Sequence, residues 1–203
     1  VNKQLELANT VVDHTVYIAS WLIDLFHGFS FSPDYSVILN GTDRRIFKFS
    51  KKEAPPVGEK FKIVTHHWSP HLLKGWDRYK ELDQALDQLN NFEFHYIGNH
   101  PTDYESKNII FHEPCNGEEL AKKLSDCHIY LSASINEPAG MHHIEGAAVG
   151  LPLVYRKSGA LPEYCGEFGE EFETFEELIK ALKKVKNNYQ VYAEKMNSYP
   201  NSA

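Results

Sequence analysis

The sequence predicts an α/β protein, with a Rossmann-like parallel sheet and helices on both faces. Short runs of β-branched and aromatic residues alternate with longer segments of helical periodicity along most of the 203 residues. Such alternation is typical of parallel sheets, because each strand needs a crossover before the next can pair in the same direction. Aromatic residues make up 13% of the chain, which supplies the core of a folded domain and argues against disorder.

The first elements are irregularly spaced. Residues 11–12 are expected to form a short strand, followed by a helix over residues 16–26. A strand over residues 36–39 ends at Asn40-Gly41, which is a turn signal. Residues 53–58 contain two prolines and are expected to form a connector.

From residue 61 the alternation becomes regular. The expected strands cover residues 61–66, 92–97, 108–111, 128–132 and 151–155, with a last short strand at Phe172. The expected helices cover residues 76–90, 118–126, 141–149 and 174–186. Thr174 is the expected N-cap of the last of these. A final helix would place Tyr189, Tyr192 and Met196 on one stripe.

Charge, cysteine content and hydropathy exclude several classes of protein. The chain has 21 basic and 28 acidic residues, a net charge of −7, so we expect no nucleic-acid partner. Three scattered cysteines without a C-x-x-C pair predict reduced thiols and a cytoplasmic location. The most apolar stretch, residues 16–26, is shorter than the ~20 residues of a membrane span. Contact with a membrane surface stays open.

The segment after the strand at residues 128–132 carries the strongest chemical signal. Ligands of parallel sheets bind beyond the carboxyl ends of the strands. There Glu137 and Glu145 flank Pro138 and Gly140, which shape the start of a helix. Free N–H groups at a helix start favour a phosphate, and carboxylates accept sugar hydroxyls, so the pattern suggests a nucleotide sugar. The alternative is a loop charge and a solvated helical residue.

A second polar segment follows the strand at residues 61–66. Lys74 precedes a helix at the same sheet edge, where it can neutralise a diphosphate; the alternative is a surface lysine. His66 and His67 are adjacent and should point to opposite faces of the strand. Because no zinc-type spacing of histidines occurs, we expect no metal. One of His142 and His143, at the next helix start, is a candidate hydrogen-bond donor to ligand.

Together these segments resemble the nucleotide-sugar-binding C-terminal half of a GT-B glycosyltransferase of the group 1 or family 4 type. The resemblance runs from about residue 36 to about residue 180. The segments that carry it are Asn40-Gly41-Thr42-Asp43 with Phe47, Lys74-Gly75, Glu137 through Gly140 with Glu145, and Gly150 through Val154 followed by Ser158-Gly159 and Pro162-Glu163. Four such segments in order are a specific signal.

The resemblance implies a role for each candidate residue. Glu145 would hold the ribose hydroxyls and Glu137 those of the transferred sugar, while Lys74 would stabilise the departing diphosphate. Glu137 and Lys74 are therefore the expected catalytic residues.

Backbone groups supply the rest of the expected site. N–H groups around Ala139, Gly140 and Met141 would face sugar and phosphate, and the base would lie near Pro114 and Cys115. The family usually has an arginine five or six residues before the lysine. Here Ser69 and Trp68 occupy those positions, which leaves open whether His66 or His67 replaces it.

The expected function is the donor-binding portion of a retaining, metal-independent glycosyltransferase of the hexosyltransferase type. The donor would be a UDP or GDP sugar, with no cofactor, in the biosynthesis of a glycan. The acceptor could be a glycan, a lipid or a small molecule. The alternatives are a nucleotide-sugar-binding module without activity and a GT-B-fold epimerase.

The resemblance also implies a division of the chain. Residues 1–35 would be a remnant of an N-terminal, acceptor-side domain, and residues 36–203 the donor domain with its C-terminal helix. We expect such a fragment to be inactive alone.

Overall fold

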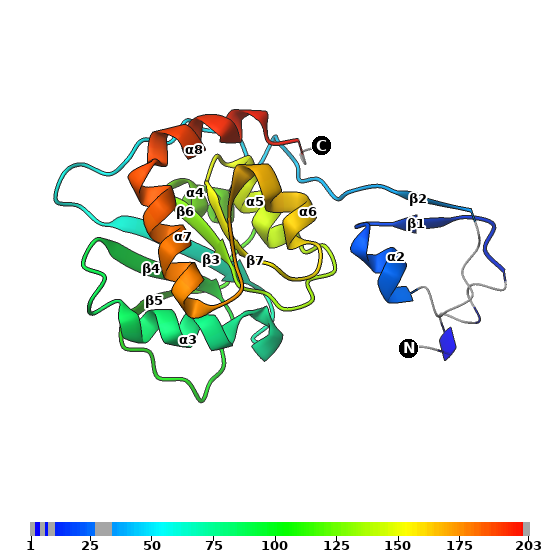
Figure 1. Ribbon diagram of the computed structural model, residues 1–203, viewed down its shortest axis with the longest axis horizontal. Coiled ribbons are helices and arrows are strands. Elements are labelled where there is room, and N and C mark those ends of the chain that lie inside the picture. Colours follow the sequence, from blue (N-terminus) through cyan, green and yellow to red (C-terminus); the bar gives the residue numbers. More distant parts are fainter. Residues whose placement is uncertain (1–2, 5–6, 8–10, 27–33, 201–203) are drawn as a thin grey trace.

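A computed structural model describes residues 3–4, 7, 11–26 and 34–200 of the chain, and its main body is one six-stranded sheet (Figure 1). All its strand pairs are parallel, and the order is β5-β4-β3-β6-β7-β8. The strands are β3 (Phe61–His67), β4 (Phe92–Gly98), β5 (Ile109–His112), β6 (Ile129–Ser132), β7 (Leu153–Arg156) and β8 (Gly169–Phe172). This architecture confirms the predicted fold class.

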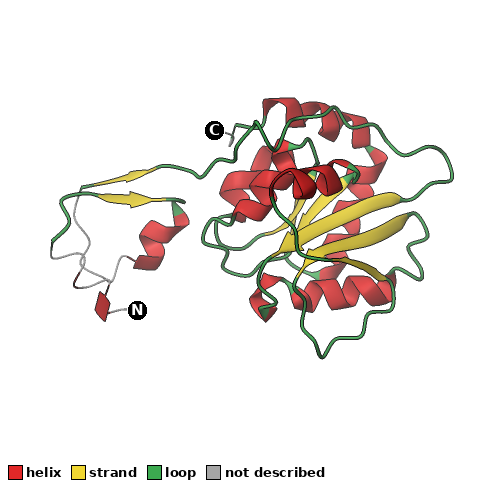
Figure 2. Cartoon of the chain, turned by 180° about the vertical axis from the view of Figure 1, so that it is seen from behind, coloured by secondary structure: helices red, strands yellow, loops and turns green. Residues whose placement is uncertain are grey.

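Helices cover both faces of the sheet, as Figure 2 shows. One face packs against α3 (Trp76–Ala85) and α7 (Phe175–Asn187). The other packs against α4 (Gly117–Ser125), α5 (Met141–Ala148) and α6 (Leu161–Cys165). Two separate apolar clusters result, one on each face. Strand β6 is buried along its whole length, because a central parallel strand is covered on both sides.

The chain then passes from one face of the sheet to the other. Helix α8 (Tyr189–Lys195) packs Tyr189 against Phe61, on the α3 side. The short helix η3 (Met196–Ser198) and Tyr199 belong to the cluster on the α5 side. The predicted final helix is therefore present, but the residues of its stripe pack into both apolar clusters, Tyr189 on the α3 side and Met196 on the α5 side.

Several element bounds differ from the expected ones. Helix α3 ends at Ala85, five residues early, because a turn leads the chain into β4. The short helices α6, η1 (Leu72–Lys74) and η2 (Gly166–Phe168) were not predicted. All three have five residues or fewer, too few for a periodic pattern to be recognised.

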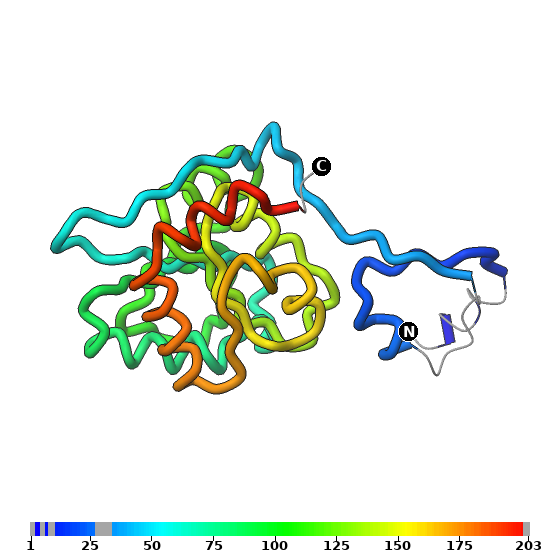
Figure 3. Tube along the Cα trace, turned by 45° about the horizontal axis from the view of Figure 1, so that its top comes forward, coloured from blue at the N-terminus to red at the C-terminus, as the bar shows by residue number. Residues whose placement is uncertain are grey.

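The N-terminal part lies beside the sheet (Figure 3), and its Tyr17, Ala19 and Leu22 belong to the cluster on the α5 side. It contains β1 (Thr15–Tyr17), α2 (Trp21–Phe26) and β2 (Tyr35–Val37), and β1 pairs with β2 in parallel. The prediction of a strand at residues 11–12 and a helix from residue 16 was wrong. β-branched Thr15 and Val16 pair with β2, so the helix starts only after Ser20.

Two loops meet where the direction of strand addition reverses. After β3 the chain adds β4 on one side, and after β6 it adds β7 on the other. The N–H of Ile135 donates to the carbonyl of Leu73 at 2.8 Å, which joins the loop after β6 to the loop after β3. Gly75 has φ of 102°, and a Cβ there would lie 2.5 Å from the Cβ of Ala133. Only glycine allows this approach, at the point where such sheets bind ligands.

The predicted N-cap of α7 provides a first test. The Thr174 hydroxyl accepts a hydrogen bond from the Glu177 N–H, and the Glu177 carboxylate accepts one from the Thr174 N–H, forming a capping box. Thr174→Ala should lower the free energy of unfolding by about 1 kcal/mol, measured by urea denaturation. Thr102→Ala, at an exposed turn, is the matched control. Equal stability of the two variants would contradict the prediction.

Candidate donor site

Strand β3 sends its two last side chains to opposite faces, as predicted. His66 faces the α5 side, where its Nε2 lies 2.7 Å from the Oε2 of Glu145. His67 faces the α3 side, where its Nε2 lies 3.0 Å from the hydroxyl of Tyr79. The alternating direction of side chains along a strand thus places two neighbouring histidines in different surroundings.

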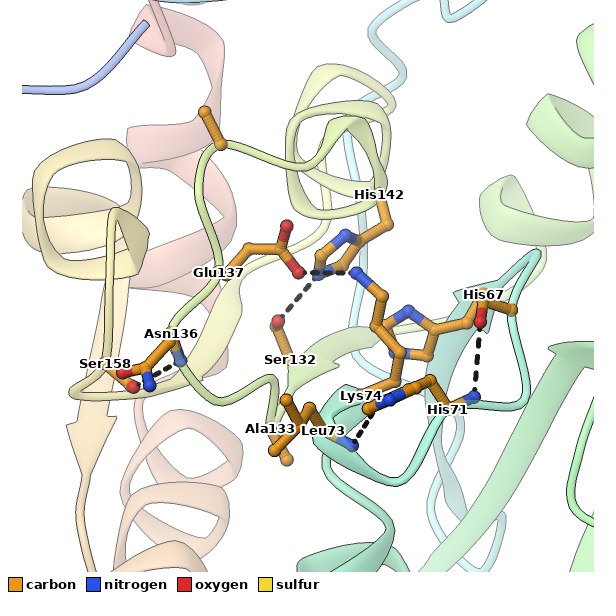
Figure 4. A network of polar contacts seen from close by, with 12 residues as sticks. His67, His71, Leu73, Lys74, Ser132, Ala133, Asn136, Glu137, His142 and Ser158 are labelled. Carbon is orange, nitrogen blue, oxygen red and sulfur yellow. Dashed lines mark hydrogen bonds and ion pairs between the residues drawn. The ribbon is translucent and has the colours of Figure 1, made fainter. Parts of the chain in front are cut away.

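Lys74 and Glu137 form an ion pair across the two loops (Figure 4). The Lys74 Nζ lies 2.8 Å from the Oε2 of Glu137, and the Glu137 side chain is 3% exposed. A carboxylate so deeply buried needs a partner, since an unpaired charge loses its hydration without compensation. Lys74 supplies it because η1 ends there and Gly75 starts α3 against the other loop.

Glu145 is part of a hydrogen-bonded chain that begins on β6. The Tyr130 hydroxyl lies 3.0 Å from the Nδ1 of His66, whose Nε2 meets Glu145. The imidazole is thus held at both nitrogens, and it holds one oxygen of the carboxylate. Tyr130 was not singled out from the sequence. Its signal is the pairing of β3 and β6, which places it on the same face as His66.

The segment from Ala133 to Gly140, hereafter the β6–α5 loop, is shaped by an unusual backbone. Asn136 has φ of 51°, a conformation that asparagine tolerates better than most residues. Its N–H donates to the Ser158 hydroxyl at 2.8 Å. A Cβ at Gly159 would lie 2.5 Å from the Glu137 nitrogen. The loop after β7 therefore supports the β6–α5 loop from outside.

The start of α5 follows directly. Gly140 is its N-cap and supplies no side chain for capping, so backbone N–H groups of the first turn face outward from the helix. Ala139 is buried, and Met141 is partly exposed. His142 points back toward β6, where its Nε2 lies 2.8 Å from the Ser132 hydroxyl (Figure 4). The Nε2 of His142 is therefore already hydrogen-bonded within the protein.

Three histidines beside the ion pair are buried and uncharged. Burial lowers the pKa of His67 and of His142 well below the ordinary value, and neighbouring histidines and Lys74 act in the same direction. Burial also lowers the pKa of His143 to about 3, helped by His66 and Lys74. His67 therefore supplies no cation in place of the arginine that the family usually has. Lys74 supplies a positive charge beside Glu137.

The structure brings most of the predicted residues to one sheet edge. Lys74 forms an ion pair with Glu137, and Glu145 lies on α5. Ala139 lies in the loop just before the N-terminus of this helix. Pro114 lies in the loop between β5 and α4, and within residues 34–200 no hydrogen bond or ion pair joins it to the others. Across the described parts of the chain, no group of three His, Cys, Asp or Glu side chains is placed to hold a metal ion.

The chemistry available at this edge is specific. Two carboxylates with one oxygen each already bonded can accept hydroxyl groups with the other. One lysine and the first turn of α5 supply positive potential for an anion. Hydroxyls and an anion bound side by side are features of a phosphorylated sugar.

The fold is that of the C-terminal half of GT-B glycosyltransferases, and solved structures resemble it. Sucrose-phosphate synthase from Thermosynechococcus elongatus matches with a TM-score of 0.75 and 17% identity, over 98% of this chain and 55% of that one. The pneumococcal O-GlcNAc transferase GtfA, solved with UDP and GlcNAc, matches with a TM-score of 0.68 and 16% identity, over 98% of this chain and 44% of that one. The C-terminal domain of a group 1 family glycosyl transferase from Francisella tularensis matches with a TM-score of 0.61 and 18% identity, over 78% of this chain and 94% of that one.

The chain belongs to the family of glycosyl transferases group 1, whose family model matches residues 74–200, more than half of the sequence. It spans about half the length of the first two of these structures. No curated protein matches it in sequence. None of the described helices is long and apolar enough to cross a membrane.

The buried histidines predict acid sensitivity. The pKa of His143 is about 3 in the folded protein and about 6.5 in the unfolded chain. As pH falls below about 6.5, the unfolded chain takes up protons first, so the free energy of unfolding decreases. His143→Phe should reduce the slope of that decrease between pH 6 and pH 4 by up to about 1.4 kcal/mol per pH unit, measured by urea denaturation.

The variant contains its own control. At pH 8 the imidazole is neutral in both states, so any difference between His143→Phe and the original protein there reports packing alone. An unchanged slope in the variant would contradict the assignment of acid sensitivity to His143.

Proposed function

We propose that the chain is the donor-binding part of a retaining glycosyltransferase, which transfers a sugar from a UDP or GDP sugar to an acceptor. The observation that carries this proposal is the pairing of Lys74 with Glu137, and of His66 with Glu145, side by side at one sheet edge. Membership of the glycosyl transferases group 1 family supports it. The complex of the similar GtfA with UDP and GlcNAc supports the donor class.

Glu145 would bind the ribose of the donor. His66 holds its Oε2 at 2.7 Å, so the carboxylate is oriented before ligand arrives, and Oε1 can accept the ribose hydroxyls. The pair is mostly buried, with 11% of the His66 side chain and 19% of the Glu145 side chain exposed. The base would lie near Pro114, because the loop after β5 lies at the same sheet edge, two strands away from β3.

Glu137 and Lys74 would act on the sugar and the diphosphate. Lysine has three donors, so Lys74 can keep Glu137 and still bind a phosphate oxygen. Glu137 would then accept hydroxyls of the transferred sugar. As the bond to the sugar breaks, negative charge grows on the diphosphate, and a fixed cation in a partly dry site stabilises that charge.

Backbone dipoles would complete the anion site. N–H groups around Ala139, Gly140 and Met141 lie at the start of α5, where the helix dipole is positive. With a lysine and these groups as the cationic elements, we propose that transfer needs no metal ion. The donor would most simply carry a hexose, as in hexosyltransferases, and the product would be a glycan.

The division of the chain is part of the same proposal. Residues up to 35 would belong to an N-terminal, acceptor-side domain; of these the structure describes 3–4, 7, 11–26, 34 and 35, and the rest lie outside the described residues. A pair of parallel strands as short as β1 and β2 is marginal alone, which favours their being the edge of a larger sheet. Transfer would need that domain, and we propose a cytoplasmic location for the whole protein.

Calorimetric titration tests the donor assignment. The chain is titrated, with EDTA present, with UDP, GDP and ADP and then with UDP-glucose, GDP-mannose and ADP-glucose. Saturable binding of one nucleotide and of its sugar is the expected result. The absence of binding to all six compounds would contradict the proposal.

Two variants separate the carboxylates. Glu145→Ala should weaken binding of the bare nucleotide by about 1–3 kcal/mol, because charged hydrogen bonds to ribose are lost. Glu137→Ala removes both the sugar contact and the ion-pair partner of Lys74. Because Lys74 stays available to the diphosphate, the affinity for the bare nucleotide should change by no more than about twofold, while the nucleotide sugar should bind more weakly. Glu105→Ala removes an exposed loop carboxylate and is the control. If the first two variants act alike on the bare nucleotide, the division of roles is wrong.

A further inference from the structure

We infer that Trp21 and Asn40 are positioning residues for the donor, because they hold two successive peptide groups of the β6–α5 loop. The indole Nε1 of Trp21 donates to the carbonyl of Pro138 at 3.3 Å. The side-chain Nδ2 of Asn40 donates to the carbonyl of Ala139 at 3.0 Å. Both residues precede β3, the first strand of the six-stranded sheet, and lie about one hundred or more positions from the groups they bind.

These two bonds complete a continuous set along the loop. The Asn136 N–H is bound by Ser158, and the Glu137 carbonyl accepts from the Ala160 N–H at 2.8 Å. The carbonyls of the next two residues, Pro138 and Ala139, accept the bonds from Trp21 and Asn40. Each of the four residues from 136 to 139 thus has one backbone group tied to a fixed partner.

The direction of these carbonyls decides where the following N–H groups point. A trans peptide is planar, so its N–H points opposite to its C=O. The carbonyl of Pro138 shares a peptide with the N–H of Ala139, and the carbonyl of Ala139 shares one with the N–H of Gly140. Trp21 and Asn40 therefore aim both N–H groups away from themselves, toward the opposite side of the loop.

The N-terminal segment is itself anchored to the sheet domain by other bonds. The Ser20 N–H and hydroxyl donate to the two oxygens of Glu163, at 2.7 and 2.8 Å. The Tyr164 hydroxyl donates to the carbonyl of Ile18 at 2.6 Å. Trp21 is therefore held in place independently of its bond to Pro138, and its ring packs against the cluster on the α5 side.

The consequence rests on the proposed function. The N–H groups of Ala139 and Gly140 are those that would bind the sugar and the diphosphate, so two side chains that precede the six-stranded sheet set their direction. A shift of the segment that carries Trp21 and Asn40 would turn these peptides and change the affinity for the sugar and the diphosphate, while the ribose contact at Glu145 would stay.

Trp21→Phe tests the inference in the free protein. The variant keeps an aromatic ring for packing, removes the N–H donor and is smaller than the indole. The amides of Ala139 and Gly140 exchange when the β6–α5 loop opens, and loss of one hydrogen bond that holds this loop should make their exchange, followed by NMR, about fivefold faster. Ser20→Ala is the matched control, because it removes a bond between the same two parts that does not touch the β6–α5 loop.

Two outcomes overturn the inference. One is unchanged exchange of both amides in Trp21→Phe, and the other is an equal acceleration in Ser20→Ala, which would mean general loosening of the segment. This measurement needs no ligand, so it stands whether or not the donor assignment does.

Titration with the nucleotide sugar that binds the original protein adds the functional readout. Trp21→Phe should weaken both that compound and its nucleoside diphosphate about fivefold, and leave the nucleoside, which has no diphosphate, unchanged. Equal weakening of the nucleoside would contradict a role confined to the sugar and diphosphate. Failure of the original protein to bind any of the six compounds would instead refute the proposed function.

Discussion

The contact between the loops that follow β3 and β6 is the constraint on which the rest of the site depends. Gly75 faces Ala133 without a side chain between them, and the backbone of Ile135 bonds to that of Leu73. These contacts set the distance between the loops, and so the distance between Lys74 and the β6–α5 loop. A larger residue at position 75 would separate them. The ion pair, the start of α5 and the position of Glu145 all follow from this approach.

Lys74 is the lysine that balances the charge of the buried Glu137 carboxylate. Trp68 and Ser69 stand where the family usually has an arginine, and the Trp68 side chain is 69% exposed and carries no charge. His67 turns to the other face of the sheet, and His66 is joined to Glu145. Burial lowers the pKa of His67, His142 and His143, so these three imidazoles shape the site without adding charge. In these low-dielectric surroundings Lys74 interacts more strongly with an anion than it would in water.

The fold was predictable from the sequence because it depends on local patterns. Strand–helix alternation determines a parallel sheet, and residues that follow parallel strands gather at one edge. The common location of Lys74, Glu137 and Glu145 at that edge was predicted in this way. Short elements such as η1 were missed, since three residues carry no period. The first strand was misplaced because β1 owes its position to pairing with β2, which no local pattern records.

The sequence by itself determined the class of fold and the residue types that gather at the edge where the strands end. Only the tertiary structure decided which of these residues are partners. Glu137 with Lys74, Glu145 with His66, and Trp21 with the carbonyl of Pro138 are separated by 63, 79 and 117 positions. Such contacts depend on how loops from different strands approach one another and on which side a peptide faces. Sequence spacing contains neither, because both are set by packing across the whole sheet.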